Sequence, residues 1–249
     1  MAYDQAKHDR STSVSLPSAR EILPYLIETF NPDSFVDVGA GYCNWAHTAS
    51  ELGVQDVAAV DGPWTDLSRI KIPRDRFHVH ELDRPLDLGR RFDMALSLEV
   101  GEHIRTDASR TLVQSLCRAS DLVVFGAATP LQGGFMHINE QWQSYWQTIF
   151  ADEGYILFDL IRPKFWNNDH VIYYYRQNAF VYVKQDRSDL IGICRAEIAA
   201  APSNPLIDAI HPAKYLEMAG YDVVLMKHLV RKLPGHVLRT AGRKLGLSR

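Results

Sequence analysis

Short apolar runs alternate with helical patterns along the first half of the chain. Runs at 35–38, 57–60, 76–79, 92–98 and 121–126 predict strands, and the last two are almost continuously apolar, as in buried parallel strands. Residues 108–119 lie between these two and carry apolar side chains at helical spacing. The repeated order of strand, helix and strand predicts an α/β fold with a doubly wound, mostly parallel sheet.

The remaining pattern adds elements at both ends of this sheet. An amphipathic helix is predicted over 17–30, and Asn139 is the predicted N-cap of a helix over 140–152. Strands are predicted at 154–159 and at 171–183, the second interrupted at 176–178, and without an intervening helix they suit an antiparallel pair. Several prolines break residues 185–249 into short pieces, so this part is treated as a C-terminal extension without an assigned function.

Length and composition suit one large domain with additions. The chain has 249 residues, 46% of them hydrophobic, and no apolar run of the length of a membrane span. Its N-terminus is polar and lacks a signal-peptide core. The cysteines, Cys43, Cys117 and Cys194, are scattered and odd in number, so we expect no disulfide framework or zinc ribbon and a cytoplasmic location.

Charge is distributed unevenly along the chain. Seven of the 27 basic residues and none of the 30 acids lie beyond Asp222, so the body carries about −10 and the tail about +7. Leu238, Ala241 and Leu245 share one face of a predicted tail helix. We interpret the tail as a solubilising helix, with weak contact to a membrane surface, a partner enzyme or a polyanion as the alternative. The acidic body argues against nucleic acid as a substrate.

A glycine turn follows the first predicted strand. Asp37, Gly39 and Gly41 stand in Phe-Val-Asp-Val-Gly-Ala-Gly-Tyr-Cys-Asn-Trp, and Asp61 ends the next apolar run. Glycines let backbone approach a ligand closely, and an acid at the second position can accept hydrogen bonds from ribose hydroxyls. The pattern therefore indicates a nucleoside cofactor. Nicotinamide is disfavoured because Asn44 occupies the third glycine position of its motif, whereas a tight turn in another α/β protein remains an alternative.

This turn resembles motif I of class I S-adenosylmethionine-dependent methyltransferases, with Cys43 in place of the last glycine. The resemblance covers about residues 33–184. It implies a seven-stranded Rossmann-like sheet, a methyltransferase domain at 1–184 and an extension at 185–249. It also implies a set of cofactor-binding residues: Asp37, Gly39 and Gly41 in the turn, Asp61 at the ribose, Glu81 and Leu82 at the adenine, and Leu98 at the end of the fourth strand.

Acids and histidines gather beyond the fourth and fifth predicted strands. Glu99, Glu102 and His103 follow the fourth strand, and would share one face of a helical turn. His137 follows the fifth strand and emerges at the same sheet edge, where active sites of open α/β sheets lie. Two carboxylates and two imidazoles suit Mg²⁺ or Mn²⁺, with Zn²⁺ as a further option.

The spacing Glu-x-x-Glu-His with a downstream His resembles the metal site of two methyltransferase groups, the small-RNA 3′-terminal ribose 2′-O-methyltransferases and the O-methyltransferases of ubiquinone biosynthesis. The resemblance implies Glu99, Glu102, His103 and His137 as metal ligands, and we predict that His103 and His137 are the catalytic residues. The alternatives need no metal: Glu102 would cap a helix, His103 would be a hydrogen-bonded residue lining the site, and His137 would act alone as a general base.

We therefore predict an S-adenosylmethionine-dependent O-methyltransferase that acts on a hydroxyl of a small molecule, such as a sugar or another vicinal diol. The alternatives are an RNA 3′-terminal 2′-O-methyltransferase and a non-catalytic cofactor-binding or scaffold protein. N-methylation of DNA is disfavoured, because no Asn/Asp-Pro-Pro-Tyr/Phe motif follows the fourth strand.

Overall fold

The computed structural model describes residues 5–200 and 207–218. The chain divides into two compact units, residues 1–209 and 210–249. The described part of the second unit includes one short helix, α8 (Pro212–Met218). The sheet and both layers of helices belong to the first unit, which is the unit that carries the predicted cofactor and metal residues.

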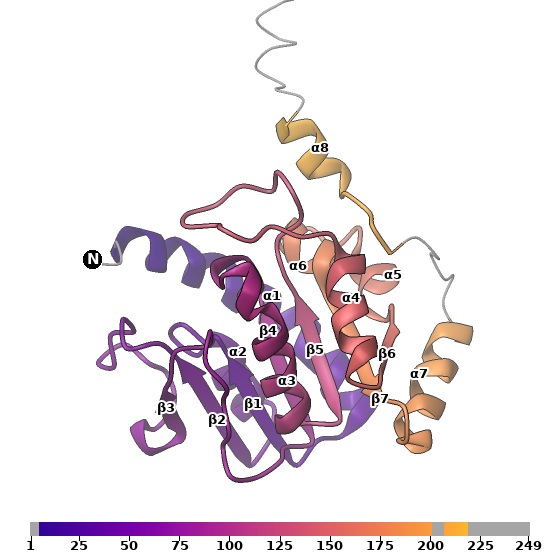
Figure 1. Cartoon of the computed structure of the whole chain (residues 1–249), viewed down its shortest axis with the longest axis horizontal. Helices are drawn as coiled ribbons and strands as arrows, with labels where there is room; N and C mark the ends of the chain where they lie inside the picture. The colour runs from indigo at the N-terminus through magenta and orange to yellow at the C-terminus, as the bar shows by residue number, and fades with distance from the viewer. Residues whose placement is uncertain (1–4, 201–206, 219–249) are drawn as a thin grey trace, which may run out of the picture. The chain divides into compact units, whose positions relative to one another are not determined.

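A seven-stranded sheet with the order β3-β2-β1-β4-β5-β7-β6 forms the centre of the first unit (Figure 1). Its strands are β1 (Ser34–Val38), β2 (Asp56–Asp61), β3 (Phe77–Val79), β4 (Met94–Leu98), β5 (Leu122–Gly126), β6 (Tyr155–Phe158) and β7 (Phe180–Lys184). β7 runs antiparallel to both β5 and β6, and the other pairs are parallel. The predicted doubly wound, mostly parallel sheet is confirmed.

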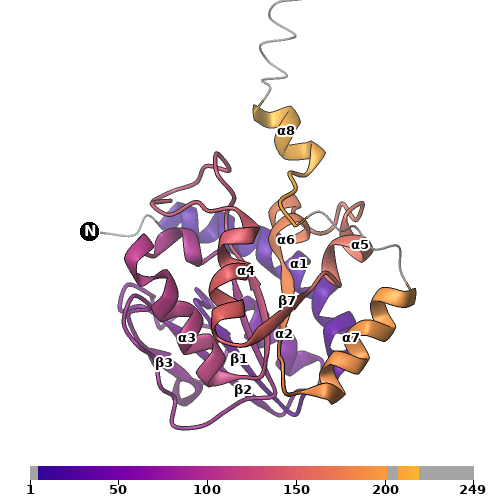
Figure 2. The same ribbon diagram turned by 45° about the vertical axis from the view of Figure 1, so that its right-hand side comes forward.

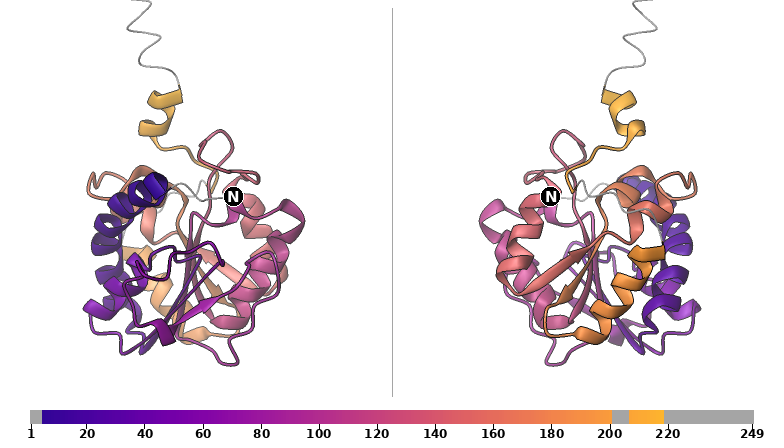
Figure 3. Two further views of the ribbon diagram at one scale, coloured as in Figure 1. Left: turned by 90° about the vertical axis from the view of Figure 1, so that its left-hand side faces the viewer. Right: turned by 90° about the vertical axis from the view of Figure 1, so that its right-hand side faces the viewer.

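Helices cover both faces of the sheet (Figures 2 and 3). α1 (Gln5–Phe30), α2 (Asn44–Glu51) and α7 (Ser188–Ala200) pack on one face, and α3 (Ser109–Ala119) and α4 (Gln143–Asp152) pack on the other. Leu190, Ile191 and Cys194 of α7 are buried in the same core as α1. The segment beyond residue 184 therefore begins with a helix that completes the core of the first unit.

Successive side chains of β1 point to opposite faces of the sheet, so this strand contributes to the cores under both helix layers. Phe35 faces the core under α1 and α2, whereas Val36 and Val38 face the core under α3 and α4. All three side chains are fully buried, as expected for a central parallel strand covered by helices on both faces. Since β1 and β4 are neighbours in the middle of the sheet, the loops that follow them start side by side at its centre.

The predicted strand over 171–183 is partly wrong. β7 begins at Phe180, and the preceding residues form the short helix α6 (Tyr173–Asn178), with α5 (Ile161–Phe165) before it. Three consecutive tyrosines favour a strand by propensity. In the structure they begin a helical turn instead, in which Tyr175 is buried against Trp45 of α2, with ring centroids 5.2 Å apart. Two short helices therefore separate the antiparallel pair.

The predicted N-terminus of α4 is also wrong. The helix begins at Gln143 with Trp142 as its N-cap, three residues later than predicted. The Asn139 side chain instead donates to the Gly101 carbonyl at 3.2 Å and to the Ser109 hydroxyl at 2.9 Å. Asn139 therefore fastens the loop after β5 to the segment after β4.

None of the described helices combines the length and the apolar character that a membrane crossing needs. The predicted basic tail helix, with Leu238, Ala241 and Leu245, lies outside the described residues.

Candidate active site

The glycine turn connects β1 to α2 at the carboxyl edge of the sheet. Gly39, Gly41 and Cys43 all have positive φ angles, of 86°, 52° and 64°. A Cβ on Gly39 would lie 2.2 Å from Cγ2 of Val100, so only glycine fits there. Gly41 has open space around its own Cβ position. The turn is thus packed tightly on the β4 side and accessible to a ligand at Gly41.

Asp61 ends β2 and holds this turn in place. Its carboxylate accepts hydrogen bonds from the backbone N–H groups of Gly41, at 2.5 Å, and of Gly62, at 2.6 Å. Burial raises the pKa of Asp61, and hydrogen bonds from these two amides, followed by those from the side chains of Trp64 and Thr65, oppose the shift. Asp61 is therefore a buried hydrogen-bond acceptor at the end of β2, beside the turn.

Asp37 lies within β1, two residues before Gly39, and is only 2% exposed. One of its oxygens, Oδ2, is buried without a hydrogen-bond partner. Burial is the largest cause that raises the pKa of Asp37 to about 8, a backbone hydrogen bond from Ala46 lowers it, and repulsion from Asp61 adds to the rise. An unpartnered buried oxygen beside the turn suits a polar group of a bound cofactor.

The raised pKa of Asp37 predicts a specific pH dependence of stability. The folded protein keeps a proton on this carboxyl up to about pH 8, whereas the unfolded chain releases it near the ordinary value of 3.8. The stabilising contribution is therefore complete below pH 3.8 and is lost as the pH rises to about 8. Urea unfolding at pH 5, 7 and 9 gives the free energy of unfolding at each pH. Between pH 5 and pH 9 this free energy should fall less for Asp37→Asn than for the wild type. Parallel profiles for the two proteins would contradict this prediction.

The predicted adenine residues follow β3. Leu82 is 6% exposed and packs into the core under α3 and α4. Glu81 is more accessible, and its carboxylate forms an ion pair with Arg84 at 3.0 Å. Leu98 ends β4 and is buried in the core under α1 and α2. The structure thus keeps all three side chains near the ends of β3 and β4, with Glu81 the most accessible of them.

Three of the four predicted metal ligands come together next to the turn. Glu102, His103 and His137 each offer one ligand atom, and these atoms lie within 4.8 Å of one another. Glu102 and His103 sit on a 3₁₀ turn, Gly101–His103, after β4, and His137 comes from the loop after β5. His137 Nε2 lies 3.9 Å from Glu102 Oε1, and the two imidazole rings meet edge to face, with centroids 4.9 Å apart.

Hydrogen bonds orient both imidazoles. The Nδ1 atom of His137 lies 2.8 Å from Oε1 of Glu140, and that of His103 lies 3.3 Å from the Met136 carbonyl. When Nδ1 donates in each pair, Nε2 carries the lone pair that a metal ion needs. The outer side of His103 reaches solvent, but the surrounding protein, followed by repulsion from His137, lowers the pKa of His103 to about 4. His103 is therefore uncharged at neutral pH.

Glu102 connects the cluster to the loop above it. Its side chain is 1% exposed, with Oε2 accepting from the Ala128 amide at 3.3 Å and Oε1 without a partner. Burial raises the pKa of Glu102 well above its ordinary range, and repulsion from Glu99 adds to the rise. The backbone carbonyl of Glu102 accepts from the amides of Ile138 and Asn139, at 2.9 and 3.1 Å. One residue thus places an unpartnered oxygen in the cluster and fixes the loop that carries His137.

Glu99 departs from the predicted arrangement. Its φ angle of 56° is left-handed, so the segment from residue 99 to 103 is not one helical turn. The two carboxylate oxygens accept hydrogen bonds from Asn178, at 2.9 Å, and from Gln132, at 2.6 Å. Burial raises the pKa of Glu99 to about 7, although these amides oppose the shift. The clustered ligand set of the described residues does not include Glu99.

Sequence reasoning missed the residues that support the cluster. Glu140 orients His137 and also accepts from the amides of Gly133, at 2.6 Å, and of Leu131, at 2.8 Å. Its spacing of three residues from His137 was the available signal. Gln132 and Asn178, which hold Glu99, come from distant parts of the chain and carry no local signal.

Comparison with solved structures identifies the architecture. No protein-family model and no curated protein matches the chain. Among solved structures, it is similar to DesVI of Streptomyces venezuelae, with 14% identity and a TM-score of 0.57 over 74% of this chain and 100% of that one. It is also similar to the methyltransferase domain of bacterial CtHen1-C, with 16% identity and a TM-score of 0.52 over 68% and 97%. The chain has the class I methyltransferase fold.

In the class I methyltransferase fold of this chain, the glycine turn and the histidine cluster lie at one edge. The turn follows β1 and the cluster follows β4 and β5, and all three strands are parallel neighbours. Val100, which packs on Gly39, directly precedes the 3₁₀ turn that carries Glu102 and His103. The two parts of the site are thus joined by one residue.

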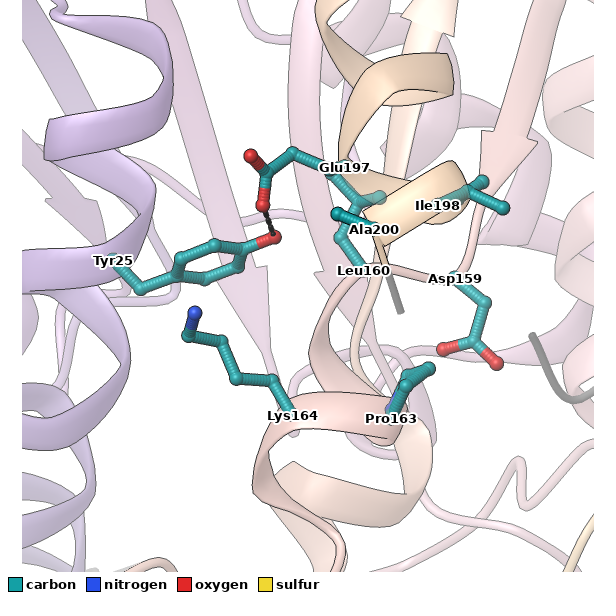
Figure 4. A pocket seen from close by; sticks show the side chains of 8 residues that line it. All are labelled: Tyr25, Asp159, Leu160, Pro163, Lys164, Glu197, Ile198 and Ala200. Carbon is teal, nitrogen blue, oxygen red and sulfur yellow. Dashed lines mark hydrogen bonds between the residues drawn. The ribbon is translucent and has the colours of Figure 1, made fainter. Parts of the chain in front are cut away.

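A separate cavity of about 150 Å³ lies between α1, α5 and α7 (Figure 4). On one side, the Tyr25 hydroxyl donates to Glu197 at 2.8 Å, and the Lys164 ammonium lies 4.2 Å from the Tyr25 ring centre. The cavity shares no lining residue with the glycine turn or the histidine cluster. The cavity is therefore separate from the candidate active site, which the turn and the cluster form.

Proposed function

We propose that this protein is an enzyme that transfers the methyl group of S-adenosylmethionine to a hydroxyl oxygen of a small-molecule acceptor, with assistance from a divalent metal ion. The observation that carries the proposal is the convergence of Glu102, His103 and His137 beside a glycine turn of the class I methyltransferase fold. The three unpaired cysteines support a cytoplasmic location.

The residues of the turn fit S-adenosylmethionine. Oδ2 of Asp37 has no hydrogen-bond partner, and there is open space at Gly41. A nucleoside cofactor would supply a hydrogen-bond donor for the first and occupy the second. Asp61 would bind the ribose, and Glu81 and Leu82 would face the adenine. The bound cofactor supplies an electrophilic methyl group, and the protein's task is to hold an acceptor oxygen in line with it.

The cluster fits a divalent ion. Glu102 Oε1 lacks a hydrogen-bond partner, and both histidines have their Nδ1 atoms engaged elsewhere. When bound, such an ion lowers the pKa of a coordinated hydroxyl. Two imidazoles and one carboxylate favour Mn²⁺ or Zn²⁺ over Mg²⁺, which prefers an all-oxygen shell. The carboxylate of Glu140 behind His137 keeps this imidazole oriented and basic.

Labelled methyl transfer tests the proposal directly. The purified protein, methyl-labelled S-adenosylmethionine and a panel of sugars and catechols with adjacent hydroxyls should give a labelled ether product. We expect transfer to cease in excess chelator and to return with Mn²⁺. Transfer only to the 3′ end of an RNA oligonucleotide would favour the RNA 2′-O-methyltransferase alternative. Binding of the cofactor without transfer to any class of acceptor would favour the non-catalytic alternative.

A further inference from the structure

Arg176 is a buried cation that the proposed transfer does not use. It lies on α6, its side chain is 8% exposed, and its Nε atom is buried without a hydrogen-bond partner. A buried charge is costly unless it is paired and its donors are satisfied. A guanidinium with an unused edge in this setting is therefore suited to a ligand.

The internal partner of Arg176 is a weak one. Both Nη1 and Nη2 donate to a single oxygen, Oδ1 of Asp169, at 3.2 Å each. Charge-assisted pairs are shorter, about 2.7–2.9 Å, and an arginine that recognises an anion well uses two parallel bonds to two oxygens. The Asp169 side chain is 95% exposed, so water competes for it. An incoming oxyanion that engages the Nε edge would make a better pair than Asp169 does.

The residues on either side of Arg176 in α6 contact the candidate active site. The next two residues are Gln177, which donates to the Thr129 hydroxyl at 3.2 Å, and Asn178, which donates to Glu99 at 2.9 Å. The residue before it, Tyr175, packs on Trp45 in the first turn of α2. The helix turn that carries Arg176 is therefore fixed both to α2, which follows the glycine turn, and to Glu99, which follows β4.

We propose that Arg176 binds an anionic group of the methyl acceptor, a phosphate or a carboxylate, and that Asp169 holds this site when no acceptor is present. The term acceptor rests on the proposed function. The anion site itself does not depend on turnover, so its failure and the failure of the proposed function are distinguishable by a binding measurement.

Two variants with opposite expected effects test the proposal. Calorimetry with methyl phosphate and with acetate is performed on the full chain saturated with S-adenosylhomocysteine, so that the carboxylate of the cofactor is already in place. We expect saturable binding of at least one probe, weakened about 10-fold or more in Arg176→Gln. Asp169→Asn removes the competing carboxylate, so its affinity for the same probe should rise several-fold.

Matched variants separate the site from general charge effects. Arg20→Gln and Asp186→Asn make the same charge changes at exposed positions of other elements and should leave probe affinity unchanged. If Arg176→Gln does not fold, the Asp169→Asn variant alone tests the proposal. The Asp169 side chain is almost fully exposed, so this variant is expected to fold. The proposal is overturned if Asp169→Asn fails to tighten binding. It is also overturned if Arg176→Gln weakens only the affinity for S-adenosylmethionine, because the anion would then be that of the cofactor.

Discussion

Replacement of His137 by alanine should abolish metal binding and methyl transfer together while the affinity for S-adenosylmethionine stays nearly unchanged. His137 directs Nε2 toward Glu102 Oε1, 3.9 Å away, and no other described residue replaces it in the cluster. Loss of a residue that only supports a ligand typically costs about 10–100-fold, so loss of the ligand itself should cost at least about 100-fold. Metal content by elemental analysis and initial rates of labelled transfer measure the two effects.

The controls for His137→Ala distinguish a ligand from a base. Glu140→Gln should produce a smaller loss of metal affinity, because it removes no ligand and alters only the hydrogen bonds that orient His137 and hold the amides of Leu131 and Gly133. His78→Ala, at an exposed position of β3, should change neither metal content nor rate. Full activity of the wild type in excess chelator, together with an inactive His137→Ala, would instead identify His137 as a metal-free general base.

Asp61→Ala should weaken S-adenosylmethionine binding by about 1–3 kcal/mol, which corresponds to about 5–150-fold in the dissociation constant. The loss has two sources: ribose hydroxyls without an acceptor, and amides of Gly41 and Gly62 without their carboxylate. Asp61→Asn keeps the size of the side chain and should retain part of the affinity. Calorimetry gives the dissociation constants, and circular dichroism verifies the fold. An unchanged dissociation constant in a folded Asp61→Ala protein would remove Asp61 from the cofactor site.

The strands and the glycine turn were predictable because their signals are local. Apolar runs mark buried parallel strands, and Gly39 is required by a positive φ angle and by the nearness of Val100. The helix α6 was not predictable, because its tyrosines favour a strand and only contacts with distant residues such as Trp45 accompany the helix. The local sequence pattern thus predicted the sheet and the glycine turn, but it missed α6, whose contacts are with distant residues.

The metal cluster was predictable in composition but not in geometry. Glu102, His103 and His137 meet because adjacent parallel strands deliver their loops to one edge, which follows from topology. Glu99 was expected to join them on a helical turn, but its left-handed backbone is not visible in residue types. The amides that hold its carboxylate come from positions 33 and 79 residues away. Such pairing is a property of the folded chain, beyond the reach of spacing rules.

The two-ended attachment of the loop after β5 separates what must stay fixed from what can vary. Glu140 ties down the amides at 131 and 133, and the Glu102 carbonyl ties down those at 138 and 139. Between these anchors, Phe135 and Met136 are 41% and 52% exposed. Side-chain exchanges at these two positions would leave the ligands of the cluster in register, because His103 contacts the backbone carbonyl of Met136 and not its side chain. Exposed loop tips tolerate sequence change, so a library confined to these two positions would vary the surface beside the cluster without displacing its ligands.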